Sequence, residues 1–266
     1  MALTDVQQTL FFPLSGRAEA ARRWPELFPD EWAEHADAIR AAEGSTAQQL
    51  GDFPAAVYGL RHRLTVQEIN TYLADHPGAA VVNIGCGLDR IVAELDDPDS
   101  LVYNLDFAEV LQARQRWVEP HEREVDLPYS VTDHTWMDHV DASRGMVAVA
   151  AGVFYYIPVD EVKALVSAIG QRMPGARLCY DAESPWLTAA SERQIRRNGT
   201  PDATMPFRVK DPYTVRTWSD RIVDVRVEAD FSRYLPQRSQ LPLGIRFAFA
   251  CMRLSKAMYE VVVTFA

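Results

Sequence analysis

The stretch AAVVNIGCGLDR, residues 79–90, constrains the fold more than any other part of the chain. Small and β-branched residues run directly into Gly85-Cys86-Gly87, which predicts a buried strand that ends in a tight turn. Closely spaced glycines after such a strand let the backbone approach a bound ligand. Dinucleotides, phosphates and nucleosides are all held by such turns, so this stretch predicts a ligand-binding turn without choosing the ligand.

Strand-like and helix-like segments alternate along the chain after this turn. We expect strands at 80–84, 101–105, 127–131, 146–151 and 176–180, and the clearest helices at 33–44, 65–78 and 158–173. Such alternation predicts a parallel sheet with helices on both faces. Two late strands, at 221–231 and 257–266, break the alternation. We therefore predict a seven-stranded sheet in which the last strand in sequence is antiparallel and lies beside the fifth.

Composition narrows the class of protein. The chain has 266 residues, of which 48% are hydrophobic, enough for one large core. A net charge of −10 argues against a nucleic-acid partner, and the longest apolar run, residues 146–157, is too short to cross a bilayer. The first ten residues lack the pattern of a signal peptide. We expect a soluble, cytoplasmic protein with no nucleic-acid or membrane partner.

The three cysteines, Cys86, Cys179 and Cys251, are expected to be small buried side chains.

The residues around the turn argue against a dinucleotide site and exclude a P-loop. Arg90 occupies the position of the third glycine in a dinucleotide motif, and no Gly-Lys-Ser/Thr follows as in a P-loop.

Asp106 ends the second strand, 21 residues after Gly85, where an acid can accept hydrogen bonds from both ribose hydroxyls. A nucleoside that carries a methionyl chain fits this arrangement, because two glycines and a cation for its carboxylate suffice. This is the layout of an S-adenosyl-L-methionine site.

The ends of the third and fourth strands extend the same pattern. Asp133 follows the third strand, where an acid can accept the adenine amino group. Gly152 follows the fourth strand and permits close approach beneath the sulfonium. Tyr155 and Tyr156 come next and are expected to lean over the cleft. Ligands bind at this carboxyl edge of open α/β sheets, so the four strand ends predict one site.

At this point the chain resembles a known family. VVNIGCGLDR is similar to the V-V-N-L-G-A-G-L-D-T/S-R motif of the leucine carboxyl methyltransferase superfamily, most closely its tetracenomycin-type polyketide O-methyltransferases. The resemblance implies a class I methyltransferase fold, Rossmann-like and α/β, with a helical cap. PLSGRAEAARR and LRHRLTVQEI resemble the segments whose cations meet the cofactor carboxylate. The residues implied to bind S-adenosyl-L-methionine are Arg17, Arg61, Gly85, Cys86, Gly87, Asp106, Phe107, Asp133, His134 and Ala151.

Two departures from the family pattern bear on function. Arg90 directly follows Asp89, so the turn is one residue shorter than usual. Ala151 stands where protein-modifying members carry an acid, which favours the small-molecule branch. We therefore predict O-methylation of a small aromatic or polyketide-like acceptor, either a carboxylate or a phenol, with S-adenosyl-L-homocysteine as product. The sequence offers no carboxylate-rich His/Asp/Glu cluster for magnesium, so we expect the transfer to need no metal.

Segments outside the sheet are expected to select the acceptor. We predict a helical cap segment at 1–60 and a methyltransferase domain at 61–266, with cap insertions near 183–215 and 233–255. Tyr155, Tyr156 and Trp186 are the predicted acceptor-binding residues. Phe207 and the cations Arg193, Arg196 and Arg208 are expected beside them.

The sequence predicts neither a catalytic base nor an oligomeric state. It leaves three other functions open: a protein C-terminal carboxyl methyltransferase, a cofactor-binding pseudo-enzyme or regulator, and a nicotinamide oxidoreductase.

Overall fold

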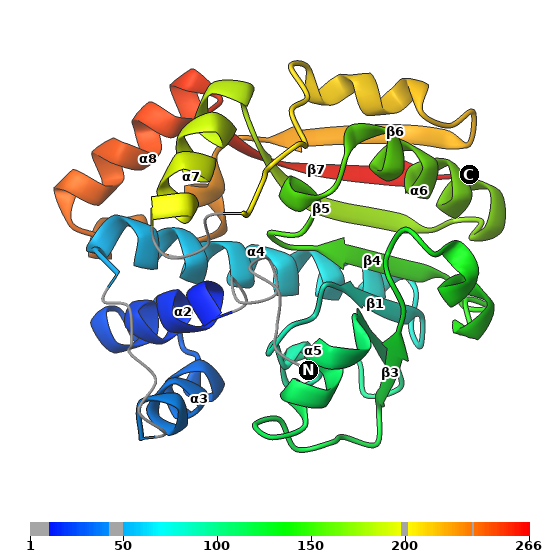
Figure 1. Cartoon of the computed structure of the whole chain (residues 1–266), viewed down its shortest axis with the longest axis horizontal. Coiled ribbons are helices and arrows are strands. Elements are labelled where there is room, and N and C mark those ends of the chain that lie inside the picture. Colours follow the sequence, from blue (N-terminus) through cyan, green and yellow to red (C-terminus); the bar gives the residue numbers. More distant parts are fainter. Residues whose placement is uncertain (1–10, 43–49, 198–201, 236) are drawn as a thin grey trace.

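The structure is a computed structural model that describes residues 11–42, 50–197, 202–235 and 237–266 (Figure 1). Seven strands form one sheet in the order β3-β2-β1-β4-β5-β7-β6. Their bounds are β1 (Ala80–Ile84), β2 (Val102–Asp106), β3 (Glu124–Pro128), β4 (Met146–Ala150), β5 (Arg177–Glu183), β6 (Ile222–Glu228) and β7 (Met258–Phe265). The α-helices are α2 (Phe11–Arg23), α3 (Glu31–Ala42), α4 (Asp52–Asp75), α5 (Ala108–Arg114), α6 (Val159–Arg172), α7 (Pro185–Arg197) and α8 (Leu243–Ser255).

Strand direction confirms the predicted topology. β1 pairs in parallel with β2 and β4, and the parallel pairing continues to β3 on one side and β5 on the other. β7 is antiparallel to both of its neighbours, β5 and β6. The last strand in sequence is therefore inserted beside the fifth, as its position after the end of the βα alternation predicts.

β1 has the predicted bounds, and the other six strands differ from theirs by one to three residues at one or both ends. β3 begins and ends three residues earlier than expected, and residues 129–131 of the predicted strand form a loop instead. β3 is an edge strand that pairs with β2 alone among the described strands, and its side chains are largely exposed. β5 extends three residues further than expected, to Glu183, because β7 pairs with it along its whole length, up to Glu183 opposite Met258.

α4 is longer than the helix predicted at 65–78. It runs for 24 residues from Asp52, and Pro54 lies in its first turn, where backbone N–H groups have no partner within the helix. The helix crosses residue 60 without a break, and the division into cap and catalytic domain stays a prediction. Short 3₁₀ helices connect the larger elements: η1 (Ile91–Glu94), η2 (His134–His139), η3 (Phe154–Tyr156), η4 (Pro212–Thr217), η5 (Phe231–Tyr234) and η6 (Arg238–Gln240).

Helices cover both faces of the sheet. The second half of α4 packs Ile69 and Leu73 on the face that includes Val81, while α6 packs Leu165 on the face that includes Val82. Neighbouring residues of one strand thus enter different cores, as the alternation of side chains along a strand requires. All five residues of β1 and of β4 are buried, consistent with central parallel strands.

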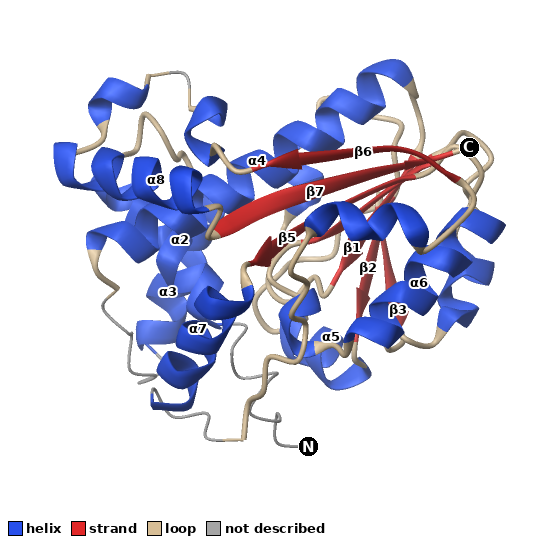
Figure 2. Ribbon diagram, turned by 90° about the horizontal axis from the view of Figure 1, so that it is seen from above, coloured by secondary structure: helices blue, strands red, loops and turns tan. Residues whose placement is uncertain are grey.

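The remaining helices gather at one end of the sheet. Figures 1 and 2 show α2, α3, α7 and α8 beyond the carboxyl ends of the parallel strands. A separate apolar core joins Leu60 at the first half of α4 to Phe249 on α8 and Met258 at the start of β7. This helical cover faces the strand ends that the sequence predicts to bind a ligand.

The structure also bears on the predictions for the cysteines and for a membrane-spanning segment. Cys86 and Cys179 are buried as predicted, but Cys251 is exposed on α8, so the prediction was wrong for that residue. Within the described ranges, no helix combines the length and the apolar character needed to cross a membrane.

Candidate functional site

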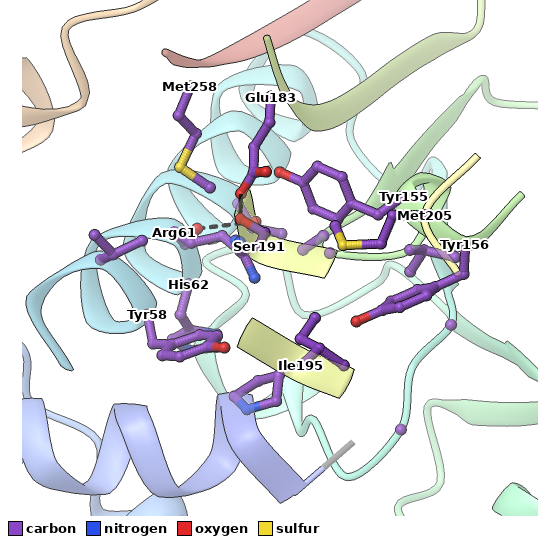
Figure 3. A pocket seen from close by; sticks show the side chains of 18 of the residues that line it. Tyr58, Arg61, His62, Tyr155, Tyr156, Glu183, Ser191, Ile195, Met205 and Met258 are labelled. Atoms are coloured by element: carbon purple, nitrogen blue, oxygen red, sulfur yellow. Dashed lines mark hydrogen bonds between the residues drawn. The ribbon is translucent and has the colours of Figure 1, made fainter. Parts of the chain in front are cut away.

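A cavity of about 1160 Å³ lies between the strand ends and the helical cover (Figure 3). Its wall includes the glycine turn after β1, the end of β2, η3 and residues of α2, α4, α7 and α8. The structure thus brings together residues that are far apart in the sequence. The predicted site residues that line this cavity are Arg17, Arg61, Gly85, Cys86, Gly87, Asp106, Phe107, Ala151, Tyr155, Tyr156 and Trp186.

Asp133 and His134 are not among the lining residues. Asp133 is exposed and caps η2, where its Oδ1 accepts hydrogen bonds from the backbone N–H and the Oγ1 hydroxyl of Thr135. Because β3 ends early, residues 129–132 form the cavity wall in this region instead. The contacts of Asp133 and His134 with the cofactor stay predictions.

The glycine turn is held by the acid at the end of β2. Gly85 and Gly87 both have positive φ, 64° and 49°. A Cβ on Gly85 would lie 2.5 Å from Cγ2 of Val153, so only glycine fits there. Asp106 accepts the backbone N–H of Gly87 at 2.9 Å and that of Phe107 at 2.8 Å, one on each oxygen. Burial raises the pKa of Asp106 above its usual value, although these two hydrogen bonds oppose the shift.

Arg17 reaches the cavity with its charge already paired. Its Nε lies 2.6 Å from Asp30 and its Nη1 lies 2.5 Å from Asp89. Asp89 also lies 3.6 Å from Nδ1 of His62, whose Nε2 lies 2.5 Å from Glu94. Burial and the Arg17 charge lower the pKa of His62, but Asp89 and Glu94 outweigh them and raise it to about 9. This network is therefore charged at neutral pH, and sequence reasoning missed its carboxylates.

Asp181, on β5, contacts three residues that line the cavity. Its carboxylate lies 2.9 Å from Nε of Arg61 and accepts the backbone N–H of Gly152 at 2.6 Å and the hydroxyl of Tyr155 at 2.8 Å. Gly152 has a φ of 76°, and a Cβ there would lie 2.9 Å from Nη1 of Arg61. Sequence reasoning did not select Asp181. The available signal was an acid in YDAES, just after a strand expected to be apolar.

Glu183 is the second functional candidate that the sequence did not reveal. It lies at the end of β5, lines the cavity and is buried. Ser191, on α7, donates a hydrogen bond of 3.1 Å to its Oε1, while its Oε2 is buried without a hydrogen-bond partner among the described residues. Burial raises the pKa of Glu183 to about 7, against the effects of Ser191 and Arg61. Its carboxyl can therefore hold or release a proton near neutral pH.

Some of the residues expected beside the acceptor line the cavity, and others lie outside it. Trp186 lies at the start of α7 and is 58% exposed. Phe207 is instead buried in the sheet core against Phe154 and Tyr180, so its predicted place beside the acceptor was wrong. The predicted cations also lie outside the cavity wall, because they project from exposed positions: Arg193, Arg196 and Arg208. Arg196 and Arg208 both pair with Glu192.

In the part of the chain that the structure describes, no three His, Cys, Asp or Glu side chains are grouped so that they could hold a metal ion. Metal-free catalysis stays a prediction.

The comparisons with known proteins bear on this site and its fold. A family model described as leucine carboxyl methyltransferase matches residues 14–170. The tetracenomycin polyketide synthesis O-methyltransferase TcmP of Streptomyces glaucescens is 25% identical over 233 residues, covering 86% of this chain and 84% of that protein. A solved DUF574 family protein from Streptomyces avermitilis has the same fold, with a TM-score of 0.57, 14% identity, and 88% and 90% of the two chains covered.

These findings confirm the predicted fold class and the predicted family resemblance. The family match includes the glycine turn, Asp106 and η3, and it extends over more than half of the chain. The chain belongs to the leucine carboxyl methyltransferase family and is an S-adenosylmethionine-dependent methyltransferase.

Proposed function

We propose that this enzyme methylates an oxygen atom of a small aromatic or polyketide-like acceptor, either a carboxylate or a phenol. The observation that carries the proposal is the continuous cavity of about 1160 Å³, which joins the glycine turn to a mainly apolar compartment under α7 and α8. Pockets for one small ligand measure roughly 300–1,000 Å³. A cavity of this size can therefore take a cofactor and an aromatic acceptor side by side.

The glycine-turn end suits S-adenosylmethionine. The missing Cβ atoms at Gly85 and Gly152 let Val153 and Arg61 pack closely against the backbone of the two turns that line the cavity. Each oxygen of Asp106 retains a lone pair for a ribose hydroxyl. Arg61 is the better cation for the methionyl carboxylate, because Arg17 already shares its charge with two acids. When bound, the cofactor supplies a methyl group on a positively charged sulfur.

The other end suits a flat, uncharged ring. Tyr155, Tyr156 and Trp186 line it and offer aromatic faces and edges for stacking. Ala151 stands at the end of β4 without the acid of protein-modifying members. The similarity to an O-methyltransferase of polyketide synthesis supports the same class of acceptor. The walls would then act by holding the acceptor oxygen in line with the methyl group and by excluding water.

The test is a panel of aromatic acids, phenols and a peptide with a C-terminal leucine, each incubated with methyl-labelled cofactor in EDTA. We expect label in aromatic small molecules. Label in the peptide alone would instead establish a protein carboxyl methyltransferase, and label that appears only with added magnesium would contradict metal-free transfer. Cofactor binding without transfer to any acceptor would indicate a pseudo-enzyme.

The cofactor assignment has its own test in Asp106→Ala. The loss of two charge-assisted hydrogen bonds to ribose should weaken S-adenosylmethionine binding by about 2–4 kcal/mol, measured by calorimetry. Asp106→Asn is the matched control, since its amide oxygen can still accept one of the two backbone N–H groups. It should lose less affinity. An Asp106→Ala protein with unchanged unfolding temperature and unchanged affinity would show that this carboxylate does not bind the cofactor.

A further inference from the structure

Glu183 has a carboxyl oxygen for which the described part of the folded chain supplies no partner. Ser191 satisfies Oε1, but Oε2 is buried in the cavity wall with no hydrogen-bond partner among the described residues. Native proteins rarely leave a buried polar atom in this state, because its desolvation is not compensated. Figure 3 shows the Glu183 carboxyl pointing into the cavity near Tyr155, Met258 and Ser191. A hydrogen-bond donor on a bound molecule would complete this site.

The antiparallel strand β7 explains why Glu183 reaches this position. Parallel pairing between β4 and β5 ends at Ala150 opposite Tyr180, whereas pairing between β5 and β7 continues to Glu183. β5 therefore carries Glu183 three residues beyond its last pairing with β4, toward α7 and the compartment proposed for the acceptor. The hydrogen-bond and electrostatic partners of this carboxyl are Ser191, Arg61 and Asp181, and they include neither the glycine turn nor Asp106.

The charges around Glu183 favour an acceptor that brings a proton rather than a negative charge. The polar groups that surround it, from every element packed against it, are Tyr58 and Arg61 of α4, Tyr155 of η3, Asp181 of β5, Ser191 of α7 and Tyr259 of β7. Arg61 is the one full positive charge in this described set, and it pairs with Asp181. The predicted cations of α7 and the following segment do not line the cavity. A carboxylate acceptor would therefore meet an acid here, and Arg61, the one cation of this set, already pairs with Asp181.

We propose that Glu183 is the general base of the reaction and that the acceptor is a phenol. This inference rests on the proposed function. Oε2 accepts the proton of the phenol hydroxyl while the phenol oxygen forms a bond to the methyl carbon. The carbon–sulfur bond breaks, its electron pair stays on sulfur as S-adenosylhomocysteine, and Glu183 later releases its proton to water.

The acid strength of both partners supports this role. A free phenol has a pKa of about 10, so it is mostly neutral at pH 7 and benefits from a base. The pKa of Glu183 is about 7, much closer to that of the phenol than an ordinary glutamate would be. A carboxylate acceptor needs no such base, since it is already ionised.

The first experiment measures kcat/KM between pH 5.5 and 8.5 for a phenol and for an aromatic acid with the same ring. With the phenol, the wild-type value should rise about tenfold per pH unit below pH 7 and then level. Glu183→Gln should lose this rise and at least about 100-fold in rate, the usual contribution of a general base. Glu260→Gln is the matched control, a buried carboxyl on β7 that does not line the cavity, and it should keep the wild-type profile. An unchanged profile in folded Glu183→Gln overturns the proposal.

The second experiment needs no turnover. Calorimetry of phenol binding to the complex with S-adenosylhomocysteine, near pH 7 and in buffers of different ionisation enthalpy, counts the protons exchanged. A phenol that donates to Glu183 stabilises the ionised carboxyl, so binding should release a fraction of a proton. Proton uptake or no exchange would contradict the proposal, and Glu183→Gln should show no exchange.

The acceptor panel separates the two proposals. Label in aromatic acids but not in phenols would leave the proposed function standing and overturn the role of Glu183. Label in no small molecule would remove the proposed function, and with it the basis of this inference.

Discussion

At the glycine-turn end of the cavity the carboxylate of Asp106 is held by two backbone N–H groups, whereas at the Glu183 end the carboxyl is held by a side chain from another element, Ser191 of α7. Gly85, Gly87 and Asp106 lie within 22 consecutive residues, and the two oxygens of Asp106 are both satisfied by backbone N–H groups. The Glu183 end draws on α4, η3, β5 and α7, and it keeps one unsatisfied carboxyl oxygen. The first end is a local, rigid construction, and the second depends on how distant elements pack.

The largest effect should come from filling the glycine turn. Gly85→Ala combines a left-handed backbone, about 1–2 kcal/mol, with overpacking against Val153, about 1–3 kcal/mol. Urea unfolding should show most of this loss of stability, and calorimetry should show cofactor affinity reduced at least about tenfold. The matched control is Gly175→Ala, whose φ is 72° with no atom within 4 Å of the new Cβ, so it isolates the backbone strain. Equal effects in both variants would mean that Val153 yields and the turn is less rigid than inferred.

A smaller effect is expected at the Glu183 end, where the free energy of unfolding should depend on pH. The pKa of Glu183 is raised from 4.5 to about 7 on folding, so the unfolded state loses this proton first as pH rises. The stability that the protonated carboxyl contributes is therefore present below pH 4.5 and is lost progressively up to about pH 7. Glu183→Gln lacks this loss, and its free energy of unfolding relative to wild type should increase by roughly 3 kcal/mol between pH 4 and pH 8.

Urea unfolding of both proteins at several pH values measures that difference. Comparing the two proteins at each pH cancels the titration of other buried acids, such as Glu260, whose pKa is also raised by burial. A difference that stays constant with pH would show that Glu183 is not held protonated in the folded protein.

The smallest effect is expected on the outer face of α7. Arg193 is exposed and does not line the cavity, so Arg193→Gln should change KM for an aromatic acceptor less than about twofold, as is usual for surface substitutions. Ser191→Ala, two residues earlier on the same helix, provides the contrast. Its hydroxyl lowers the pKa of Glu183, so its removal should move the pH profile of phenol methylation upward. A larger change for Arg193→Gln would restore a direct role for the cations.

The sequence predicted the glycine-turn end well for a physical reason. A buried strand that ends in two glycines leaves few alternatives, and β1 has the expected bounds. Asp106 follows one βα unit later, a spacing that parallel strands turn into proximity. The weaker prediction was β3, where the edge position allowed a polar strand and moved Asp133 away from the cavity wall.

The Glu183 end could not be predicted from neighbouring residues. Phe207 and the cations near it were expected at the cavity because their segment was predicted to be a cap insertion that faces the methyl group. The packing of that segment instead buries Phe207 in the sheet core. The position of Glu183 depends on β7, which is 75 residues further along the chain and extends β5 by pairing with it. Such a dependence is invisible in the local pattern of YDAES.

By itself, the sequence determined the class of fold and the turn at Gly85. It also determined which parallel strands end at the ligand site. These features follow from backbone geometry and hydrophobic periodicity, which act over short distances. Only the tertiary structure decided that Asp181 holds Arg61, Gly152 and Tyr155 together and that Glu183 enters the cavity with a raised pKa. Burial and charge pairing depend on which distant elements meet, and the antiparallel strand β7 and the helices α4 and α7 bring those elements to the acceptor end.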